Sequence, residues 1–380
     1  MIRRVIIKNF KSLDVDVTLD PVTVLVGRSG TGKTNFVNAL RFLRTFLAAP
    51  DTVFGSNSAM YWQAMLPTAA PPEGEMRFTV EYDIPGVLES SVYEVVFRYN
   101  KQHRQIRLVE EKLGMGNDIL FHTLSNKWST EPKVSTLPEV YPNRPVLSEL
   151  NGIKKVSLAY IALTQGLGCY DFPGSVCTDS GHDTNKQNDL GDSAENYATV
   201  FDAIQKDWSR PKAWDDINAA LKSLNASFET IDKSARQGGR IIVSHAFNGK
   251  VITFDINQES EGFRRFLAHL LALYQTPSKQ TLVFEEPEKG IHPGALQTLA
   301  EEIKACPKDG RGQVILTTHS PNLLDHFPPE SIRAVEIHEH VTKIGKLTSD
   351  QIESLKENLL RPGELLTVED AKIEAQSREA

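Results

Sequence analysis

The stretch VTVLVGRSGTGKTN, residues 22–35, decides the fold of this 380-residue chain. Its first five residues are an apolar run that predicts a buried strand. Residues 27–34 then match the pattern GxxxxGK[ST] without a mismatch. Apolar residues from Phe36 to Leu47 recur at spacings of four, three and four, which predicts an amphipathic helix directly after the loop. Strand, loop and helix together predict a phosphate-binding loop in an α/β protein.

The residue types of this phosphate loop, residues 27–34, suit a nucleoside triphosphate. Glycines let successive backbone N–H groups face one anion, and the helix N-terminus adds a favourable dipole. Lys33 is expected to reach the β- and γ-phosphates, and the Thr34 hydroxyl to ligate Mg²⁺. We therefore expect ATP and Mg²⁺ as cofactors. The predicted nucleotide-binding residues are Gly27, Arg28, Ser29, Gly30, Thr31, Gly32, Lys33, Thr34 and Asn35.

Two further strand ends carry residues suited to hydrolysis. TLVFEE, residues 281–286, is an apolar strand that ends in two carboxylates. Glu285 can hold Mg²⁺ directly or through water, and Glu286 can accept a proton from the attacking water. A second apolar strand, QVIL, leads to His319, which is placed to contact a γ-phosphate or that water. A histidine at a strand end is more often structural, but the phosphate loop and the paired acids favour the catalytic interpretation.

A Ser-x-Gly pattern precedes another predicted helix. The signature segment, residues 258–262 with the sequence QESEG, stands directly before FRRFLAHLL. Ser260 and Gly262 at a helix start offer a hydroxyl and free N–H groups, which can form a second anion site. Taken by itself, the pattern is better explained as a simple helix N-cap.

The rest of the chain divides by pattern. Between 75 and 128, apolar and polar residues alternate in segments separated by turn residues, which predicts an antiparallel meander. Residues 168–193 indicate a loop, with helices expected near 194–208 and 212–224. Two β-rich runs joined around Asn248-Gly249 predict a hairpin. We expect an ATPase core, a β-rich lobe with a helical insertion, and a tail, at 1–50 with 255–345, 51–254 and 346–380 respectively.

Composition excludes several classes. The 42 Lys and Arg against 49 Asp and Glu give a net charge of −7, which excludes a protein that coats nucleic acid by bulk charge but leaves a local DNA contact open. Three cysteines without a CxxC pair indicate reducing surroundings. No apolar run approaches the ~20 residues that span a bilayer, and no signal peptide is evident. We expect a cytoplasmic protein with no membrane partner.

The sequence resembles the ABC-type ATPases, because it contains a phosphate loop, a Ser-x-Gly pattern, paired acids and a histidine in this order. It resembles the RecF, SMC and OLD-like branch more than it resembles the transporter subunits. The runs IIKNFKSLDVDV at 6–17 and FEEPEKGIHPG at 284–294 carry the closer resemblance. It implies an ABC-type P-loop ATPase core and a homodimer that pairs head to tail around ATP-Mg²⁺. Ser260 and Gly262 would then touch the γ-phosphate in trans, Glu286 would act as the base and His319 as the γ-phosphate sensor.

The resemblance leaves several roles open. Stand-alone ATPases of this kind resemble those of bacterial antiphage defence, where an ATP-gated sensor works with a separate effector such as a nuclease or toxin. The alternatives are a RecF-like DNA-binding repair ATPase and a nucleotide-locked scaffold with little turnover. The scaffold stays open because Glu285 stands where Asp is usual. Oligomers larger than the dimer also stay open.

Overall fold

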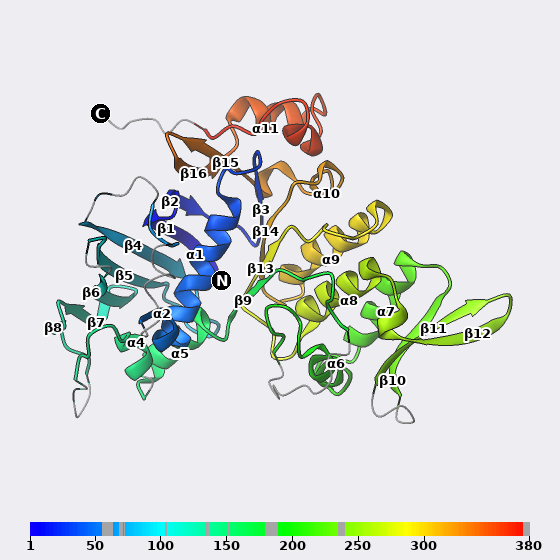
Figure 1. Cartoon of the computed structure of the whole chain (residues 1–380), viewed down its shortest axis with the longest axis horizontal. Helices are drawn as coiled ribbons and strands as arrows, with labels where there is room; N and C mark the ends of the chain where they lie inside the picture. The colour runs from blue at the N-terminus through cyan, green and yellow to red at the C-terminus, as the bar shows by residue number, and fades with distance from the viewer. Residues whose placement is uncertain are drawn as a thin grey trace. The chain divides into compact units, whose positions relative to one another are not determined.

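The structure is a computed structural model. It describes residues 1–54, 64–67, 71, 73–102, 105–133, 137, 139–150, 152–178, 189–234 and 240–374. The chain divides into two compact units, unit 1 (Met1–Leu167 and Pro329–Ala380) and unit 2 (Gly168–Pro328). Figure 1 labels their elements.

Unit 1 is built on a run of strands in the order β8-β7-β6-β5-β4-β1-β2-β16-β15-β3. These strands are β1 (Ile2–Phe10), β2 (Leu13–Thr18), β3 (Val22–Val26), β4 (Glu73–Tyr82), β5 (Ser91–Asn100), β6 (Gln105–Met115), β7 (Asp118–Leu124), β8 (Lys127–Thr130), β15 (Ile332–His338) and β16 (Val341–Lys346). Its helices are α1 (Lys33–Ala48), α2 (Pro50–Phe54), α4 (Val146–Glu149), α5 (Lys154–Leu163) and α11 (Ser349–Lys356), with 3-10 turns η4 (Pro329–Ser331) and η5 (Pro362–Leu366).

The predicted antiparallel meander is confirmed, and it is continuous with the sheet of the phosphate loop. Strands β4 to β8 pair antiparallel in chain order, and β4 also pairs antiparallel with β1. β1 in turn pairs with β2, and β3 lies parallel to β15. The β-rich segment therefore belongs to the same compact unit as the phosphate loop.

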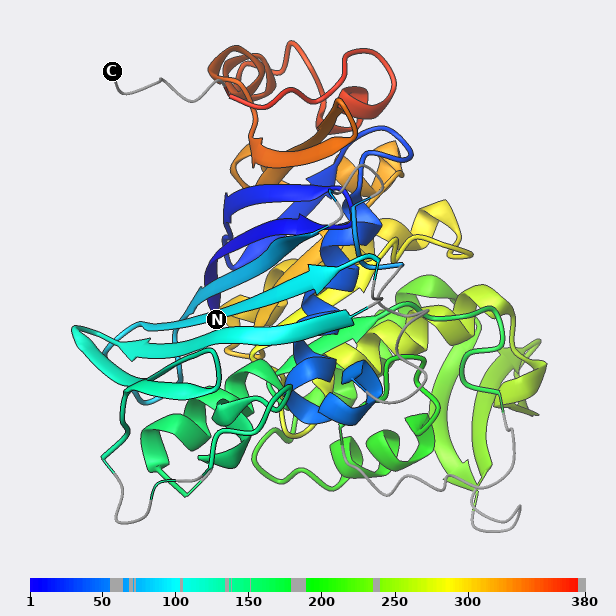
Figure 2. The ribbon, with the colours of Figure 1, turned by 60° about the vertical axis from the view of Figure 1, so that its left-hand side comes forward.

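Aromatic packing holds helix α1 against this sheet. The Phe42 ring lies 5.4 Å from that of Phe78, and the Phe46 ring lies 4.9 Å from that of Phe97. Figure 2 shows the blue helix against strands coloured blue to cyan. Fully burying each such ring contributes about 1.5–3 kcal/mol. This packing fixes the helix whose first turn ends the phosphate loop.

Unit 2 contains a short sheet in the order β14-β13-β9 and a three-stranded sheet in the order β10-β11-β12. These strands are β9 (Leu167–Tyr170), β10 (Phe228–Ser234), β11 (Arg240–Phe247), β12 (Lys250–Asp255), β13 (Thr281–Glu285) and β14 (Gln313–Thr317). Its helices are α6 (Tyr197–Gln205), α7 (Ala213–Leu224), α8 (Glu261–Tyr274), α9 (Leu296–Lys308) and α10 (Pro321–Leu324), with 3-10 turns η2 (Ile256–Gln258) and η3 (Pro293–Ala295).

Most elements predicted for unit 2 are confirmed. Helices α6 and α7 lie within the expected ranges, and the β11–β12 hairpin turns at Asn248 and Gly249, whose φ angles are 50° and 74°. The loop expected over 168–193 is wrong at its start, because residues up to Tyr170 form the buried strand β9. Residues 179–188 of that loop lie outside the described residues.

The expected tail, residues 346–380, contains secondary structure among its described residues. It carries α11 and η5, and Leu347 forms a bridge with Ile373. The predicted domain boundaries follow the sequence pattern and stay a prediction. Among the described residues, no helix is both long and apolar enough to cross a membrane.

Candidate functional site

The phosphate loop keeps its shape through two glycines that the fold requires. Gly32, at the N-cap of α1, has a φ of 104°. A Cβ atom there would lie 2.2 Å from the Thr342 hydroxyl oxygen, and one on Gly27 would lie 2.3 Å from the Val335 carbonyl oxygen. Strands β15 and β16 therefore pack so closely under the loop that both positions must be glycine.

A hydroxyl network supports the loop. Thr342 is completely buried, and its hydroxyl donates to the Thr31 carbonyl at 2.7 Å. The same oxygen lies 2.7 Å from the Ser12 hydroxyl, which accepts from the Asn35 amide at 2.8 Å. Asn35, predicted among the nucleotide-binding residues, here holds Ser12. No local pattern indicates Ser12 or Thr342, since they lie 330 residues apart in the chain.

Lys33 is folded back onto the phosphate loop. Its ammonium donates to the carbonyl oxygens of Gly27 and Arg28, each at 2.8 Å, and Lys33 as a whole is 4% exposed. The Thr34 side chain is exposed at the start of α1. Lys33 is thus buried and Thr34 is accessible, and their contacts with phosphate and Mg²⁺ stay predictions.

Arg28 binds the C-terminal segment. Its guanidinium contacts the Asp370 carboxylate at 2.6 and 2.9 Å. The backbone carbonyl of Asp370 in turn accepts from the buried Gln351 amide on α11 at 2.8 Å. The segment at Asp370 is thus anchored both to α11 and to the phosphate loop, although exposed ion pairs contribute about 1 kcal/mol or less.

The predicted paired acids stand at the end of β13 in unit 2. All five residues of this strand are buried, and Glu285 at its end is 9% exposed. The chain turns at Glu286, whose φ is 46° and whose backbone N–H donates to the Thr317 carbonyl at 3.1 Å. A left-handed conformation in a residue with a side chain carries strain, of order 1–3 kcal/mol, which often marks a functional position.

The structure brings Glu286 and His319 together. Their nearest side-chain atoms, Glu286 Oε1 and His319 Nε2, are 3.9 Å apart. On the other side, Lys289 Nζ lies 3.5 Å from Glu286 Oε2. Parallel pairing of β13 with β14 places both strand ends at one edge of the sheet. Glu286 and His319 therefore lie near each other within unit 2, and their shared role in hydrolysis stays a prediction.

Glu288 fixes the backbone next to His319. Its Oε1 accepts from the Thr318 hydroxyl and from the His319 backbone N–H, both at 2.8 Å. Burial raises the pKa of Glu288 above its ordinary value, against the opposing effect of these hydrogen bonds. The run FEEPE contained this residue, but its role depends on contacts that no sequence spacing indicates.

Ser260 and Gly262 of the signature segment have local structural roles. Ser260 is the N-cap of α8, and its hydroxyl accepts from the Phe263 N–H at 3.2 Å. A Cβ atom on Gly262 would lie 2.7 Å from the Gly290 carbonyl oxygen. The N-cap interpretation is thus confirmed, and Gly262 allows the segment after β13 to pack against α8. Contact with a γ-phosphate stays a prediction.

Comparisons with known proteins define the class. Residues 1–127 match the sequence model of a family described as "AAA ATPase domain", and residues 173–325 match one described as "AAA domain, putative AbiEii toxin, Type IV TA system". No curated protein matches this chain. The matched families make this a P-loop ATPase fold.

Solved structures define the fold. A structure of the SMC head bound to the C-winged helix domain of ScpA is 13% identical, with a TM-score of 0.56 over 93% of this chain and 99% of that one. An Smc head domain with an extended coiled coil, bound to the C-terminal domain of ScpA derived from Pyrococcus furiosus, is 12% identical, with a TM-score of 0.55 over 94% and 99%. The chain therefore has the ABC-type P-loop ATPase fold of an SMC head domain. The predicted fold class is confirmed.

Proposed function

We propose that this protein binds ATP with Mg²⁺ and hydrolyses it. The observation that carries the proposal is the phosphate loop, with its left-handed Gly32, its buried Lys33 and its exposed Thr34. On ATP binding, Lys33 exchanges the carbonyls of Gly27 and Arg28 for oxygens of the β- and γ-phosphates. The loop N–H groups and the dipole of α1 supply the remaining positive potential.

Thr34 and Glu285 are the proposed ligands of Mg²⁺. A hydroxyl and a carboxylate are hard oxygen donors of the kind that Mg²⁺ prefers. When bound, the ion would neutralise charge on the β- and γ-phosphates.

Glu286 is the proposed general base and His319 the γ-phosphate sensor. The water oxygen forms a bond to the γ-phosphorus as its proton passes to a Glu286 carboxylate oxygen, and the bond from that phosphorus to the bridging oxygen breaks to leave ADP. His319 Nε2 donates to a γ-phosphate oxygen. The 3.9 Å separation of Glu286 and His319 supports roles at one reacting group.

We further propose that two chains pair head to tail, so that Ser260 and Gly262 of one chain contact the γ-phosphate held by the other. The resemblance of the signature segment to that of ABC-type ATPases supports this arrangement. The structurally similar SMC heads are seen bound to ScpA domains, which supports a protein partner for a head of this fold.

The biological role that we favour is that of a sensor ATPase in a bacterial defence complex with a separate effector. The description of the family that matches residues 173–325 names a toxin of a type IV toxin–antitoxin system, which supports a defence role. A RecF-like repair ATPase and a nucleotide-locked scaffold are the competing roles, and the scaffold gains support from Glu285 at the usual Asp position.

Steady-state ATP hydrolysis by the purified chain tests the proposal. We expect Mg²⁺-dependent turnover that Glu286→Gln abolishes while ATP affinity is kept, and loss of ATP binding in Lys33→Ala. ATP affinity unchanged in Lys33→Ala would contradict the proposed site. Adding duplex DNA distinguishes the proposed roles. Turnover that DNA stimulates favours the repair ATPase, and turnover that does not depend on DNA favours the sensor. Tight ATP binding without turnover favours the scaffold.

A further inference from the structure

We propose that His245 and Glu259 are positioning residues that hold the signature segment in the geometry needed for γ-phosphate contact. The inference rests on the proposed function, since it gives these two side chains a task in the same reaction. Neither belongs to the phosphate loop or to the paired acids at the end of β13.

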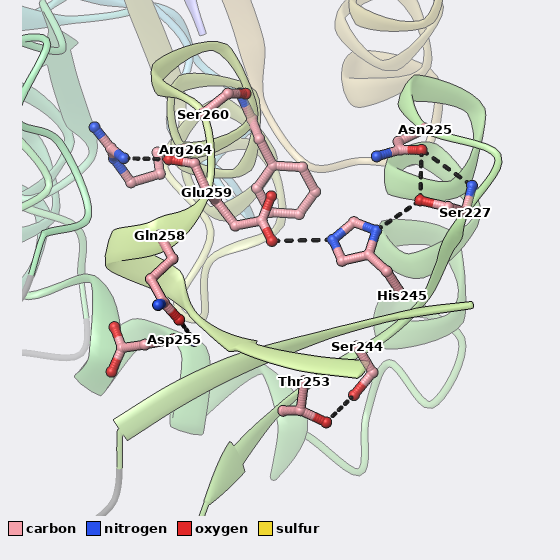
Figure 3. A network of polar contacts seen from close by, with 11 residues as sticks. Asn225, Ser227, Ser244, His245, Thr253, Asp255, Gln258, Glu259, Ser260 and Arg264 are labelled. Carbon is pink, nitrogen blue, oxygen red and sulfur yellow. Dashed lines mark hydrogen bonds and ion pairs between the residues drawn. The ribbon is translucent and has the colours of Figure 1, made fainter. Parts of the chain in front are cut away.

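The two side chains form a close, buried contact. Glu259 Oε1 lies 2.9 Å from His245 Nε2, and the side chains are 11% and 4% exposed. Because a carboxylate only accepts hydrogen bonds, Nε2 carries the proton in this contact. Figure 3 shows the imidazole pointing from β11 toward the residue that directly precedes Ser260.

The imidazole is also held from its other side. His245 Nδ1 lies 2.9 Å from the Ser227 hydroxyl, and the Ser227 backbone N–H donates to the Asn225 side-chain carbonyl at 3.0 Å (Figure 3). The rings of Phe228, Phe254 and Phe263 lie about it, with centroids 5.8 to 6.5 Å away. Exclusion of water by these rings strengthens the polar contacts and fixes the ring.

The backbone on both sides of Glu259 is tied to other elements. Before it, the Asp255 carboxylate accepts from the Asn257 N–H at 2.9 Å and so closes turn η2. After it, Arg264 donates to the Glu259 carbonyl and, at 3.2 Å, to the Val176 carbonyl. The Glu259 side chain adds the link to the β10–β12 sheet. One residue further along the chain is Ser260, so the position of Ser260 depends on this link.

The expected effect is on turnover. A displacement of about 1 Å in a group that contacts the reacting phosphate costs about 100-fold in rate. Loss of the link should therefore lower kcat by about 10- to 100-fold. ATP affinity should change little, because the phosphate loop belongs to unit 1 and makes the main contacts with ATP.

The test compares Glu259→Ala, Glu259→Gln and His245→Gln with Ser244→Ala. Ser244 is the neighbour of His245 on β11, and its variant breaks a 3.2 Å hydrogen bond to Thr253 without touching Glu259. Glutamine at 259 keeps an acceptor oxygen, and glutamine at 245 keeps an N–H donor, so both should recover part of the activity that Glu259→Ala loses. The measurements are kcat, the Kd for ATP, and thermal stability.

We expect kcat to fall at least tenfold in Glu259→Ala, partly to recover in the glutamine variants, and to stay unchanged in Ser244→Ala. Equal kcat in Glu259→Ala and Ser244→Ala would overturn the inference. If Glu259→Ala does not fold, the glutamine variants decide. Wild-type kcat in Glu259→Gln, in His245→Gln and in the variant that carries both changes would overturn the inference. Failure of the proposed function would give a different result. In that case the wild-type protein would show no ATP turnover that the Glu286→Gln change removes.

Discussion

Gly32 shows how closely the shape of the phosphate loop depends on a single residue. It combines a φ of 104° with a Cβ position 2.2 Å from the Thr342 hydroxyl oxygen, whereas Gly30 has a φ of 79° and open space around it. Substitutions at the two positions therefore distinguish the effect of backbone strain alone, at Gly30, from strain combined with steric overlap, at Gly32.

Gly32→Ala should abolish ATP binding, and Gly30→Ala should weaken it by about tenfold, because a left-handed residue with a Cβ costs about 1–2 kcal/mol. Equilibrium titration with ATP, with folding checked by circular dichroism, measures both. Equal losses in the two variants would show that the contact with Thr342 is unimportant.

Residue type and spacing predict candidate functional residues at this scale, and the roles of these residues stay predictions. Lys33 follows from the phosphate-loop pattern, and Glu286 and His319 follow from motifs at strand ends. The structure places the last two 3.9 Å apart. Ser12 and Thr342 were out of reach, because their role comes from pairing between distant strands. Glu288 and His245 likewise depend on contacts that only the folded chain creates.

At the scale of elements, helix α8 shows how burial sets a pH dependence. His269 packs edge-on against Phe172, 4.9 Å between ring centroids, and its Nδ1 lies 2.7 Å from the Arg265 carbonyl oxygen. Burial lowers the pKa of His269 from 6.5 to about 4. The folded protein therefore keeps this imidazole neutral at pH values where the unfolded chain protonates it.

The sign follows from linkage. Stability from neutral His269 is fully present above pH 6.5, falls as the pH drops, and levels off below about 4. Between pH 7 and pH 5 the loss should be about 2 kcal/mol. Urea unfolding of wild type and His269→Leu at both pH values should show that their difference in unfolding free energy shrinks by this amount at pH 5. His338→Gln, at an exposed position, is the control. An unchanged difference would contradict the buried neutral form.

Elements with a strong local pattern were predictable, and short ones were not. The apolar spacing of α8 and the Asn248-Gly249 turn carry their own signals. β9 has four residues next to a polar segment, and α11 has eight residues in a region of polar composition. Their structure comes from neighbours in space, for example the Gln351 amide that binds the backbone of Asp370.

At the scale of the whole molecule, the head-to-tail dimer makes a distinctive prediction. Each site is proposed to combine one chain's phosphate loop with the other chain's signature segment. Lys33→Ala then inactivates the phosphate loop that a chain contributes, and Ser260→Arg inactivates the signature segment that it contributes. Each variant alone should be inactive. An equimolar mixture should recover about a quarter of wild-type turnover, since half of the dimers are mixed and each of these holds one intact site of two.

Mixing Lys33→Ala with Glu286→Gln is the matched control for this experiment. Both residues are assigned to the same chain's part of the site, so this pair should recover nothing. Recovery in the control, or none in the test mixture, would argue against pairing in trans.

The hairpin of unit 2 has a practical consequence for handling the protein. β12 ends its three-stranded sheet, and Val251 and Ile252 on it are 65% and 45% exposed. An apolar edge strand is a template on which a second molecule can add its own strand and so begin to aggregate. Mutual repulsion from the net charge of −7 opposes this, and salt screens that repulsion. Concentrated samples should therefore keep best in dilute buffer at a pH well above the isoelectric point of about 5.9.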